Sequence, residues 1–569
     1  MKWLGFAALA VLCLALRIPR LEGPVDLRFD AGIYYTLGTS LAQGKGYRIL
    51  SEPGEIHEIQ YPPLLPAVAA AHQLVLGTAD PDIIGPALRW SYFLLFTAYV
   101  LAVFWTASAY LATGLAFLVA LIVALHFRTN FNADYFIAEL PFGLVAVLFV
   151  GIVGRNDTAG SPAGRHPPGY RAVASGLLAL LGFYLRTVGI VLLGLWVAES
   201  LFRRQYRQAA LRMAVALLGV GAWQGYVAAV QGGPEYVEPA YPYQRAAYMM
   251  YNVTYGENFW LIEPLRPEAG RASARNLLAR VGSNLSELAI AWGESISIDR
   301  NWWVGEAAKL NRMLGRELFP RWTGAAALIS LTTLILGGLV LLGSRRRWLI
   351  PSYLAMSIAL IVIAPYPGSL KRYAASFAPF SAIALLALVS WVWHRLARVA
   401  GWRRPIGRLA VTAVVAVILA QEIHTLRKSF RMLYYPATWV DSDGRRRTYP
   451  LLAYNRQWRL HDEALAWLRH HATPGEIIAT STPHWAYLKT QLKTVQPPWE
   501  HDPRTAQRLL DAVPADYLII DNLLAYELGE VARRYSIPVV QAFPERWKLI
   551  YAVADSGSRI YRRVAVPQE

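Results

Sequence analysis

Residues 26–50, DLRFDAGIYYTLGTSLAQGKGYRIL, and residues 61–66, YPPLLP, follow the first hydrophobic segment of the chain. The stretch contains an acid, Asp30, then an aromatic pair, a Gly-Lys-Gly-Tyr turn and a proline-rich return to apolar sequence. An ordinary polar loop between two membrane spans is one interpretation, because acids outside the membrane are common. The paired aromatic residues and the prolines favour the other interpretation, a functional site beside a membrane.

The composition of the whole chain predicts a membrane protein. Of its 569 residues, 55% are hydrophobic and 17% are charged, which is too apolar for an ordinary soluble enzyme of this length. The net charge is +18, but the arginines form short clusters between apolar segments, a pattern typical of orientation in a bilayer. We therefore expect no nucleic-acid partner. The single cysteine, Cys13, excludes a disulfide framework and a cysteine-based metal site.

About eleven apolar segments are long enough to be candidate membrane spans. The first, residues 3–16, resembles the core of a signal peptide, but residues 17–20, RIPR, stand where a cleavage site with small residues is expected. We therefore predict that it is an uncleaved first span. The other candidates are residues 90–110, 114–127, 140–154, 172–185, 188–202, 213–230, 322–342, 348–364, 374–393 and 409–423.

Residues 61–77 are apolar but short and rich in proline. If they lie along the membrane surface, the short arginine-rich loops share one side, which the positive-inside rule assigns to the cytoplasm. If they cross, either the N-terminus or these loops fall on the wrong side, so we predict an interfacial helix. The arginines concerned are Arg155, Arg165, Arg171, Arg203, Arg204, Arg207, Arg345, Arg346, Arg347, Arg395, Arg398, Arg403 and Arg404.

Counting the spans in this way also places four regions outside the cytoplasm: the Asp30 loop, residues 128–139, residues 231–321 and everything after about residue 426. The long loop at 231–321 is rich in aromatic residues, a pattern that favours an interfacial belt over a sugar-stacking surface. We predict a transmembrane module at 1–426, which includes outer loops at 19–89 and 231–321, and a small periplasmic α/β domain at 427–569.

The C-terminal domain is predicted from alternating helical and strand patterns. Helices are expected at 461–471, 503–512 and 525–535, and strands at 476–480, 517–521, 538–542 and 548–553. The domain has no G-x-G-x-x-G, P-loop or H-E-x-x-H motif, so we expect a structural or acceptor-positioning role.

Charged residues stand beside apolar segments at four places on the outer side. Asp30 is the first, and Asp134 with Glu139 is the second, although an acid such as Glu139 at a helix start also interacts favourably with the helix dipole. Arg186 is the third, with a snorkelling interfacial arginine as the alternative. Lys371 and Arg372 form the fourth, a basic pair against the general charge bias, which favours function.

Together these residues predict a cavity at the outer leaflet with carboxylates and cations. A carboxylate can serve as general base to an attacking hydroxyl, while arginine and lysine hold a phosphate whose charge grows as a sugar bond breaks. Because no nucleotide is available outside the cytoplasm, a sugar donor must be carried by a lipid.

Six short segments occur in this order along the chain: FDAGIYY (29–35), GKGY (44–47), YPPL (61–64), AELPF (138–142), LR (185–186) and KRY (371–373). With these segments the chain resembles the C-type (GT-C) integral membrane glycosyltransferases, in the bacterial branch similar to protein O-mannosyltransferases and the lipid A aminoarabinose transferase. The resemblance covers roughly residues 1–395, and the tail is more loosely similar to the periplasmic domain that many members carry. It implies a mainly α, polytopic GT-C-like fold with a C-terminal extracytoplasmic α/β domain.

The resemblance also implies residue roles. Asp30 would be the first-loop catalytic acid, acting as base, and Glu139 the second-loop acid, which would orient the acceptor or hold a substrate hydroxyl. The substrate-binding residues would be Arg372 as a phosphate ligand with Lys371 and Arg186, together with Tyr373, Tyr61 and Tyr35. Ala31 follows Asp30 where some relatives have a second acid, and the acid pair of metal-dependent oligosaccharyltransferases is missing. We therefore expect no metal and no cofactor, with the lipid-linked sugar as substrate.

The sequence thus predicts an inverting glycosyltransferase in a bacterial inner membrane. Its partners would be a polyprenyl-phosphate sugar, membrane lipid and an acceptor glycan, lipid or protein outside the cytoplasm. A polytopic transporter or flippase is the main alternative, and its intramembrane polar groups would line a path through the bilayer. A non-catalytic scaffold, or a ligase that uses a lipid diphosphate, is a second.

Overall fold

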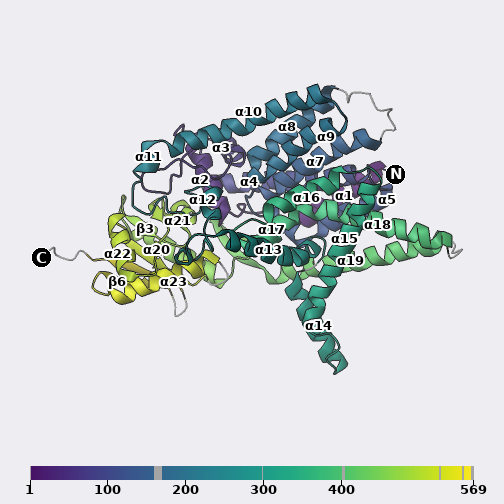
Figure 1. The fold of residues 1–569 in the computed structure, drawn as a ribbon. Coiled ribbons are helices and arrows are strands. Elements are labelled where there is room, and N and C mark those ends of the chain that lie inside the picture. The colour runs from purple at the N-terminus through teal and green to yellow at the C-terminus, as the bar shows by residue number, and fades with distance from the viewer. Residues whose placement is uncertain are drawn as a thin grey trace.

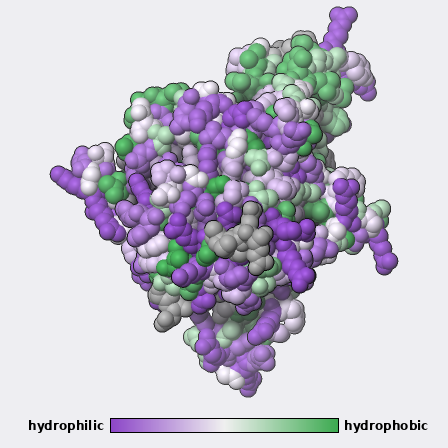
Figure 2. Space-filling model, turned by 90° about the vertical axis from the view of Figure 1, so that its left-hand side faces the viewer, coloured by the Kyte–Doolittle hydropathy of each residue, from purple (hydrophilic) through white to green (hydrophobic). Residues whose placement is uncertain are grey.

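The computed structural model describes residues 2–158, 169–297, 299–399, 404–523, 527–553 and 557–564. A bundle of long helices forms most of the molecule, and a C-terminal α/β module lies at one end of it (Figure 1). Viewed from that end, the surface is mostly hydrophilic, with a hydrophobic patch at its upper right edge (Figure 2). The expectation of a mainly helical membrane protein with a C-terminal α/β region is confirmed.

Each of the eleven apolar segments forms a helix. By length and composition, five apolar stretches could cross a membrane: 2–20, 81–107, 206–231, 322–344 and 370–396. The helices that correspond to the eleven apolar segments are α1 (Lys2–Arg17), α4 (Pro81–Ala107), α5 (Thr113–Leu125), α7 (Glu139–Thr158), α8 (Gly169–Leu185), α9 (Ile190–Phe202), α10 (Tyr206–Gln231), α15 (Trp322–Ser344), α16 (Leu349–Ile361), α18 (Ala378–Val399) and α19 (Arg404–Met432). Arg165 and Arg403, two of the arginines used to orient the chain, lie outside the described residues.

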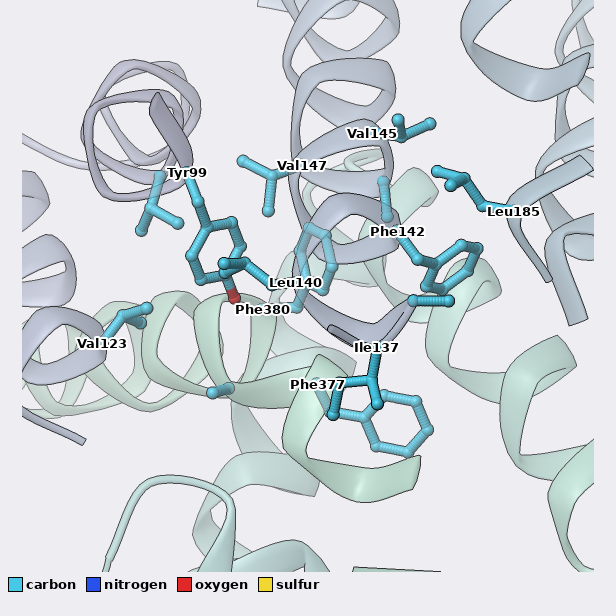
Figure 3. Close-up of a cluster of buried hydrophobic side chains, with 14 of the residues drawn as sticks. Tyr99, Val123, Ile137, Leu140, Phe142, Val145, Val147, Leu185, Phe377 and Phe380 are labelled. Atoms are coloured by element: carbon cyan, nitrogen blue, oxygen red, sulfur yellow. The ribbon is translucent and has the colours of Figure 1, made fainter. Parts of the chain in front are cut away.

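α4, α7, α15 and α18 form two of the closely packed helix pairs of the bundle. α4 packs against α7, and α15 packs against α18. Small residues permit this close approach, because a Cβ at Gly338 would lie 2.1 Å from the backbone of Ala384. Phe142, Phe377, Ile137 and Leu185 lie close together in a buried apolar cluster at the end of the bundle where the charged residues gather (Figure 3).

Asp30 begins a helix, α2 (Asp30–Ala42), where the sequence predicted a loop. α2 packs on α3 (Leu64–Leu76), and a Cβ at Gly38 would lie 2.6 Å from that of Ala69. α3 has 13 residues, fewer than the roughly 20 that a crossing helix needs. Its location at the membrane interface stays a prediction.

The segment between α10 and α15 is more helical than a simple loop. It contains α11 (Pro234–Val237), α12 (Tyr255–Phe259), α13 (Ala274–Glu294) and α14 (Arg300–Leu314), the last of which projects away from the bundle (Figure 1). Short helices complete the connections: α6 (Phe127–Asn132), α17 (Leu370–Ala374), η1 (Ile18–Arg20), η2 (Thr187–Gly189), η3 (Pro267–Ala269), η4 (Pro367–Ser369) and η5 (Ala375–Phe377).

The C-terminal module begins with an antiparallel hairpin, β1 (Tyr434–Val440) and β2 (Arg446–Leu452). A five-stranded sheet follows in the order β4-β3-β5-β7-β6, in which β3 is parallel to β4 and β5, and β7 is antiparallel to β5 and β6. The strands are β3 (Ile477–Ala479), β4 (Lys493–Val495), β5 (Tyr517–Ile520), β6 (Trp547–Ala552) and β7 (Arg559–Arg563), and the helices are α20 (Arg456–His471), α21 (Pro483–Thr490), α22 (Pro503–Ala512) and α23 (Glu527–Ala542).

The prediction of a strand at 538–542 is wrong, because α23 continues through Pro538 to Ala542. Val531, Tyr535 and Val539 are buried at intervals of four residues. This helical spacing continues past Pro538, although the proline indicated that the helix ends before it. Residues 525 and 526 of the predicted third helix lie outside the described residues. The hairpin β1–β2 was not predicted.

Arg28 joins the C-terminal module to the bundle. Its guanidinium forms a fully buried ion pair with Asp26 at 2.6 Å and donates to the carbonyl of Leu452 at 2.7 Å. It also lies over the ring of Trp458, with 4.6 Å between the guanidinium carbon and the ring centroid. A single buried cation therefore connects the loop before α2 to the hairpin and to α20.

We predict that Arg28→Met destabilises the protein by about 3–5 kcal/mol, because it leaves the Asp26 carboxylate buried without a cation. Thermal unfolding of the purified protein and limited proteolysis of the hairpin measure the effect. The matched control is Arg446→Met, at an exposed position of β2. Equal losses in the two variants would contradict the role of Arg28.

Candidate functional site

Four segments bring charged residues together at the end of the bundle next to the C-terminal module. Asp30 is the first residue of α2 and Glu139 the first residue of α7, so each carboxylate lies at the positive end of a helix dipole. Arg186 lies between α8 and η2, and Arg372 lies on α17. Residues from 30 to 372 in the sequence thus meet at one place.

The four side chains form a chain of alternating charge. Arg372 Nη1 donates to Asp30 Oδ2 at 2.7 Å, and Arg372 Nε lies 2.6 Å from Glu139 Oε1. Arg186 Nη1 lies 3.0 Å from the same Glu139 oxygen. Both carboxylates are buried, and each is paired with at least one guanidinium, as buried charges require.

A group of tyrosines surrounds this chain of charges. The Tyr251 hydroxyl donates to Asp30 Oδ1 at 3.1 Å. The ring of Tyr61 lies against Tyr34, Tyr251 and Tyr255, with centroid distances of 4.9, 5.8 and 6.2 Å. Burial, followed by the Asp30 carboxylate, raises the pKa of Tyr61 well above its ordinary value, so its hydroxyl stays neutral.

Tyr251 and Tyr255 are exceptions to the predicted interfacial belt. Both belong to the aromatic-rich loop, yet Tyr251 is buried against Asp30 and Tyr255 lines the cavity described below. Nothing in the local sequence distinguishes these two tyrosines from the other aromatic residues of the loop. For the rest of the loop the belt stays a prediction.

A cavity of about 410 Å³ opens beside the charges. Its polar wall contains Arg186 and Arg372 with Tyr34, Tyr61, Tyr255 and Tyr373, and Arg186 lies over the ring of Tyr373 at 5.5 Å. Its apolar wall comes from several segments: Phe142, Leu185, Val188, Ile190, Leu360, Ile361, Ile363 and Phe377. Neither Asp30 nor Glu139 is among the described residues that line it. The cations thus face the cavity, and the carboxylates hold them on the other side.

The structure brings most of the predicted site residues together. Asp30, Glu139, Arg186 and Arg372 form the chain of charges, and Tyr61 and Tyr373 line the cavity. Two predicted residues lie elsewhere, as described next, and Asp134 instead pairs with Arg17 at 2.5 Å.

Lys371 and Tyr35 do not reach the cavity. The Lys371 ammonium lies 3.1 Å from Glu294 and 3.0 Å from Asp299, because neighbouring residues on a helix point in different directions. For the same reason Tyr34 lines the cavity and Tyr35 does not. The Tyr35 hydroxyl donates to the carbonyl of Ala79 at 2.8 Å.

In the described part of the chain, no group of three or more His, Cys, Asp or Glu side chains could hold a metal ion. The metal independence expected from the sequence stays a prediction.

No family model matches the chain, and no curated protein matches its sequence. Solved structures do match. ArnT from Cupriavidus metallidurans bound to undecaprenyl phosphate is 12% identical with a TM-score of 0.52, and the match covers 99% of this chain and 98% of that chain. The archaeal oligosaccharyltransferase AglB from Archaeoglobus fulgidus, in complex with an inhibitory peptide and a dolichol-phosphate, is 10% identical with a TM-score of 0.52, covering 99% and 74%. The chain therefore has the fold of the C-type membrane glycosyltransferases, as its sequence predicts.

We predict that Arg372 and Glu139 are energetically coupled. Arg372→Met leaves two buried carboxylates with one guanidinium, so Glu139→Gln in the same chain should restore part of the lost stability, with a coupling of about 1–3 kcal/mol. Thermal unfolding of the two single variants and the double variant measures it. The exposed pair Lys309 and Glu306, 2.9 Å apart, is the control and should show less than about 1 kcal/mol. Additive effects at Arg372 and Glu139 would contradict the coupling.

Proposed function

We propose that this protein is an inverting glycosyltransferase that moves one sugar from a polyprenyl-phosphate carrier to an acceptor hydroxyl. The observation that carries the proposal is the pair of guanidiniums, Arg186 and Arg372, at the wall of a cavity that is otherwise mainly apolar and aromatic. An anionic head group on an apolar chain fits such a cavity, because two arginines can bind phosphate oxygens while the chain contacts hydrocarbon.

The donor lipid would enter from the membrane side. Ile190, Leu360 and Ile363 line the cavity and are each about two-fifths exposed, at 44%, 38% and 40%. These side chains offer an apolar entrance for a polyprenyl chain, and Tyr61 and Pro62 also line the cavity. As the sugar–phosphate bond breaks, negative charge grows on the phosphate, and Arg186 and Arg372 stabilise it. Lys371 is not assigned to the phosphate, because Glu294 and Asp299 hold its ammonium.

Asp30 is proposed as the general base. Its Oδ2 is held by Arg372, and its Oδ1 accepts a hydrogen bond from a hydroxyl, that of Tyr251. An acceptor hydroxyl that replaced the Tyr251 hydroxyl would donate to the same oxygen. Its oxygen attacks the anomeric carbon, the bond from that carbon to the phosphate oxygen breaks, the proton passes to Asp30 and polyprenyl phosphate leaves. A single displacement of this kind inverts the anomeric centre.

Glu139 is assigned a positioning role in place of contact with the acceptor, because its carboxylate holds both guanidiniums. Two solved structures of the same fold support the choice of donor: ArnT is bound to undecaprenyl phosphate and AglB to a dolichol-phosphate. We do not propose a transporter, because the chain of charges lies at one end of the bundle, beside the C-terminal module, and not along a path through it.

We expect Asp30→Asn to fold, because Arg372 keeps its ion pair with Glu139, and to lose transfer by at least about 100-fold, because a neutral amide replaces the carboxylate that serves as base. The assay offers a panel of radiolabelled polyprenyl-phosphate sugars to purified protein, with and without chelator, and measures released polyprenyl phosphate. Asp443→Asn, an exposed acid of the hairpin turn, is the control. Near-normal turnover by Asp30→Asn would remove Asp30 from the mechanism, and loss of wild-type turnover with chelator would disprove metal independence.

We also propose that the site and the C-terminal module lie on the outer side of a bacterial inner membrane. Arg155 and Arg347, from two of the arginine clusters, both contact the α4–α5 region: Arg155 donates to Ser108 at 3.0 Å, and Arg347 donates to the carbonyl of Tyr110 at 3.0 Å. The positive-inside rule makes that end of the bundle cytoplasmic.

Cysteine labelling tests this orientation in a Cys13→Ser background. Ser442→Cys, in the exposed hairpin turn, should react with a membrane-impermeant maleimide when spheroplasts are intact. Ser344→Cys, exposed at the end of α15, should react only after they are permeabilised. The reverse pattern would refute the proposed orientation.

A further inference from the structure

A second cavity, of about 560 Å³, lies between the outer loops of the transmembrane module and the C-terminal module. One wall comes from residues 24–27 and 79–82, and the other from the hairpin, the end of α20 and α21. Among the described residues, none lines both this cavity and the first one. Its floor is buried and includes Val25, Trp439 and Tyr449, whereas Asp80 and Arg469 at its rim are exposed.

The cavity is built around three aromatic side chains. Trp439 and Tyr449 pack edge to face, with ring centroids 5.3 Å apart. Trp485 is held in place because its indole nitrogen donates to Asp462 at 2.7 Å. Trp439, whose indole nitrogen is buried, contributes ring surface to the floor.

Charged groups of both signs face each other across the cavity. Asp80 and Asp82, at the start of α4, belong to one wall, and Arg469 and Lys489 to the other. In the described part of the chain no ion pair within 4.0 Å joins the two walls, although the Lys489 ammonium lies 4.6 Å from the centroid of the Trp485 ring. Asp26 also lines the cavity, but its carboxylate is paired with Arg28. The cavity therefore offers acceptors on one side and donors on the other, and the remaining charges balance.

This combination favours a neutral polyhydroxyl ligand. Sugar hydroxyls can donate to the aspartates and accept from the arginine and the lysine, while the apolar faces of a sugar ring pack against aromatic side chains. A phosphate would meet two carboxylates, and a lipid chain would desolvate four charges without replacing their partners. A saccharide satisfies both the charged walls and the aromatic floor.

The cavity is next to the elements that hold the proposed base. Leu27 lines it and lies three residues before Asp30. Trp485 follows His484, which packs against Gly32 of α2: a Cβ at Gly32 would lie 3.1 Å from the His484 Cβ. The His484 ring also contacts the ring of Tyr251, with 5.1 Å between centroids. The same segments thus shape the second cavity and the surroundings of Asp30.

We infer that this cavity binds the carbohydrate portion of the acceptor. The inference rests on the proposed transferase function and deepens it, since it assigns the acceptor to the saccharide class, a glycan or a glycolipid, rather than an unmodified protein. The non-reacting sugars of the acceptor would lie between the two modules, and the reacting hydroxyl would extend toward Asp30.

Isothermal titration calorimetry on the full-length protein tests the inference, in a detergent without a sugar head group, because a maltoside would compete. The probes are chitotetraose and maltotetraose as neutral tetrasaccharides, and tetragalacturonate as an anionic one. We expect millimolar or tighter binding of at least one neutral probe, weakened about tenfold by Trp485→Ala. Arg469→Gln, at the exposed rim, should also weaken it and serves if Trp485→Ala does not fold.

The control is Trp467→Ala, whose ring stacks on Tyr551 outside the cavity and whose loss should leave binding unchanged. The inference is overturned if no neutral probe binds, if Trp485→Ala and Arg469→Gln bind as the wild type does, or if only the anionic probe binds. Its failure is distinct from that of the proposed function: a wild type that releases polyprenyl phosphate from a donor but binds no saccharide refutes this site alone. A wild type that binds saccharide but uses no donor refutes the transferase alone.

Discussion

The site depends on one constraint: carboxylates buried at the end of a membrane bundle must be paired with cations. Asp30 and Glu139 each begin a helix, and they are connected through Arg372, with Arg186 closing the series. Removing one partner of a buried ion pair lowers the stability of the fold by several kcal/mol. The four segments that carry these residues therefore hold one another in place. The helices of the bundle supply the rigid frame, and the ion pairs determine how their ends meet.

The helices of the bundle and the charged residues of the site were predictable from sequence because both depend on local composition. A run of apolar residues long enough to cross a bilayer must be a helix, and the arginine clusters between the runs indicate a common side. Asp30, Glu139, Arg186 and Arg372 were found because they stand beside apolar segments on the side opposite the arginine clusters.

What was missed depends on the direction of side chains and on contacts distant in sequence. Lys371 and Tyr35 each adjoin a residue of the site, but consecutive residues on a helix point in different directions, and a one-residue error moves the side chain to another environment. Tyr251 reaches Asp30 across 221 residues of sequence, a contact that no local pattern contains. The strand predicted at 538–542 is the opposite error. There the proline was taken to end the helix, although the buried residues at helical spacing continue past it.

Arg372 connects the cavity to the Asp30 carboxylate. Its guanidinium lines the cavity and also donates to Asp30 Oδ2 at 2.7 Å. Under the proposed function, a donor phosphate bound at the cavity wall competes with Asp30 and Glu139 for this one guanidinium. Occupancy of the cavity and the position of the Asp30 side chain are therefore mechanically linked, because a phosphate that moves Arg372 also releases one oxygen of the carboxylate.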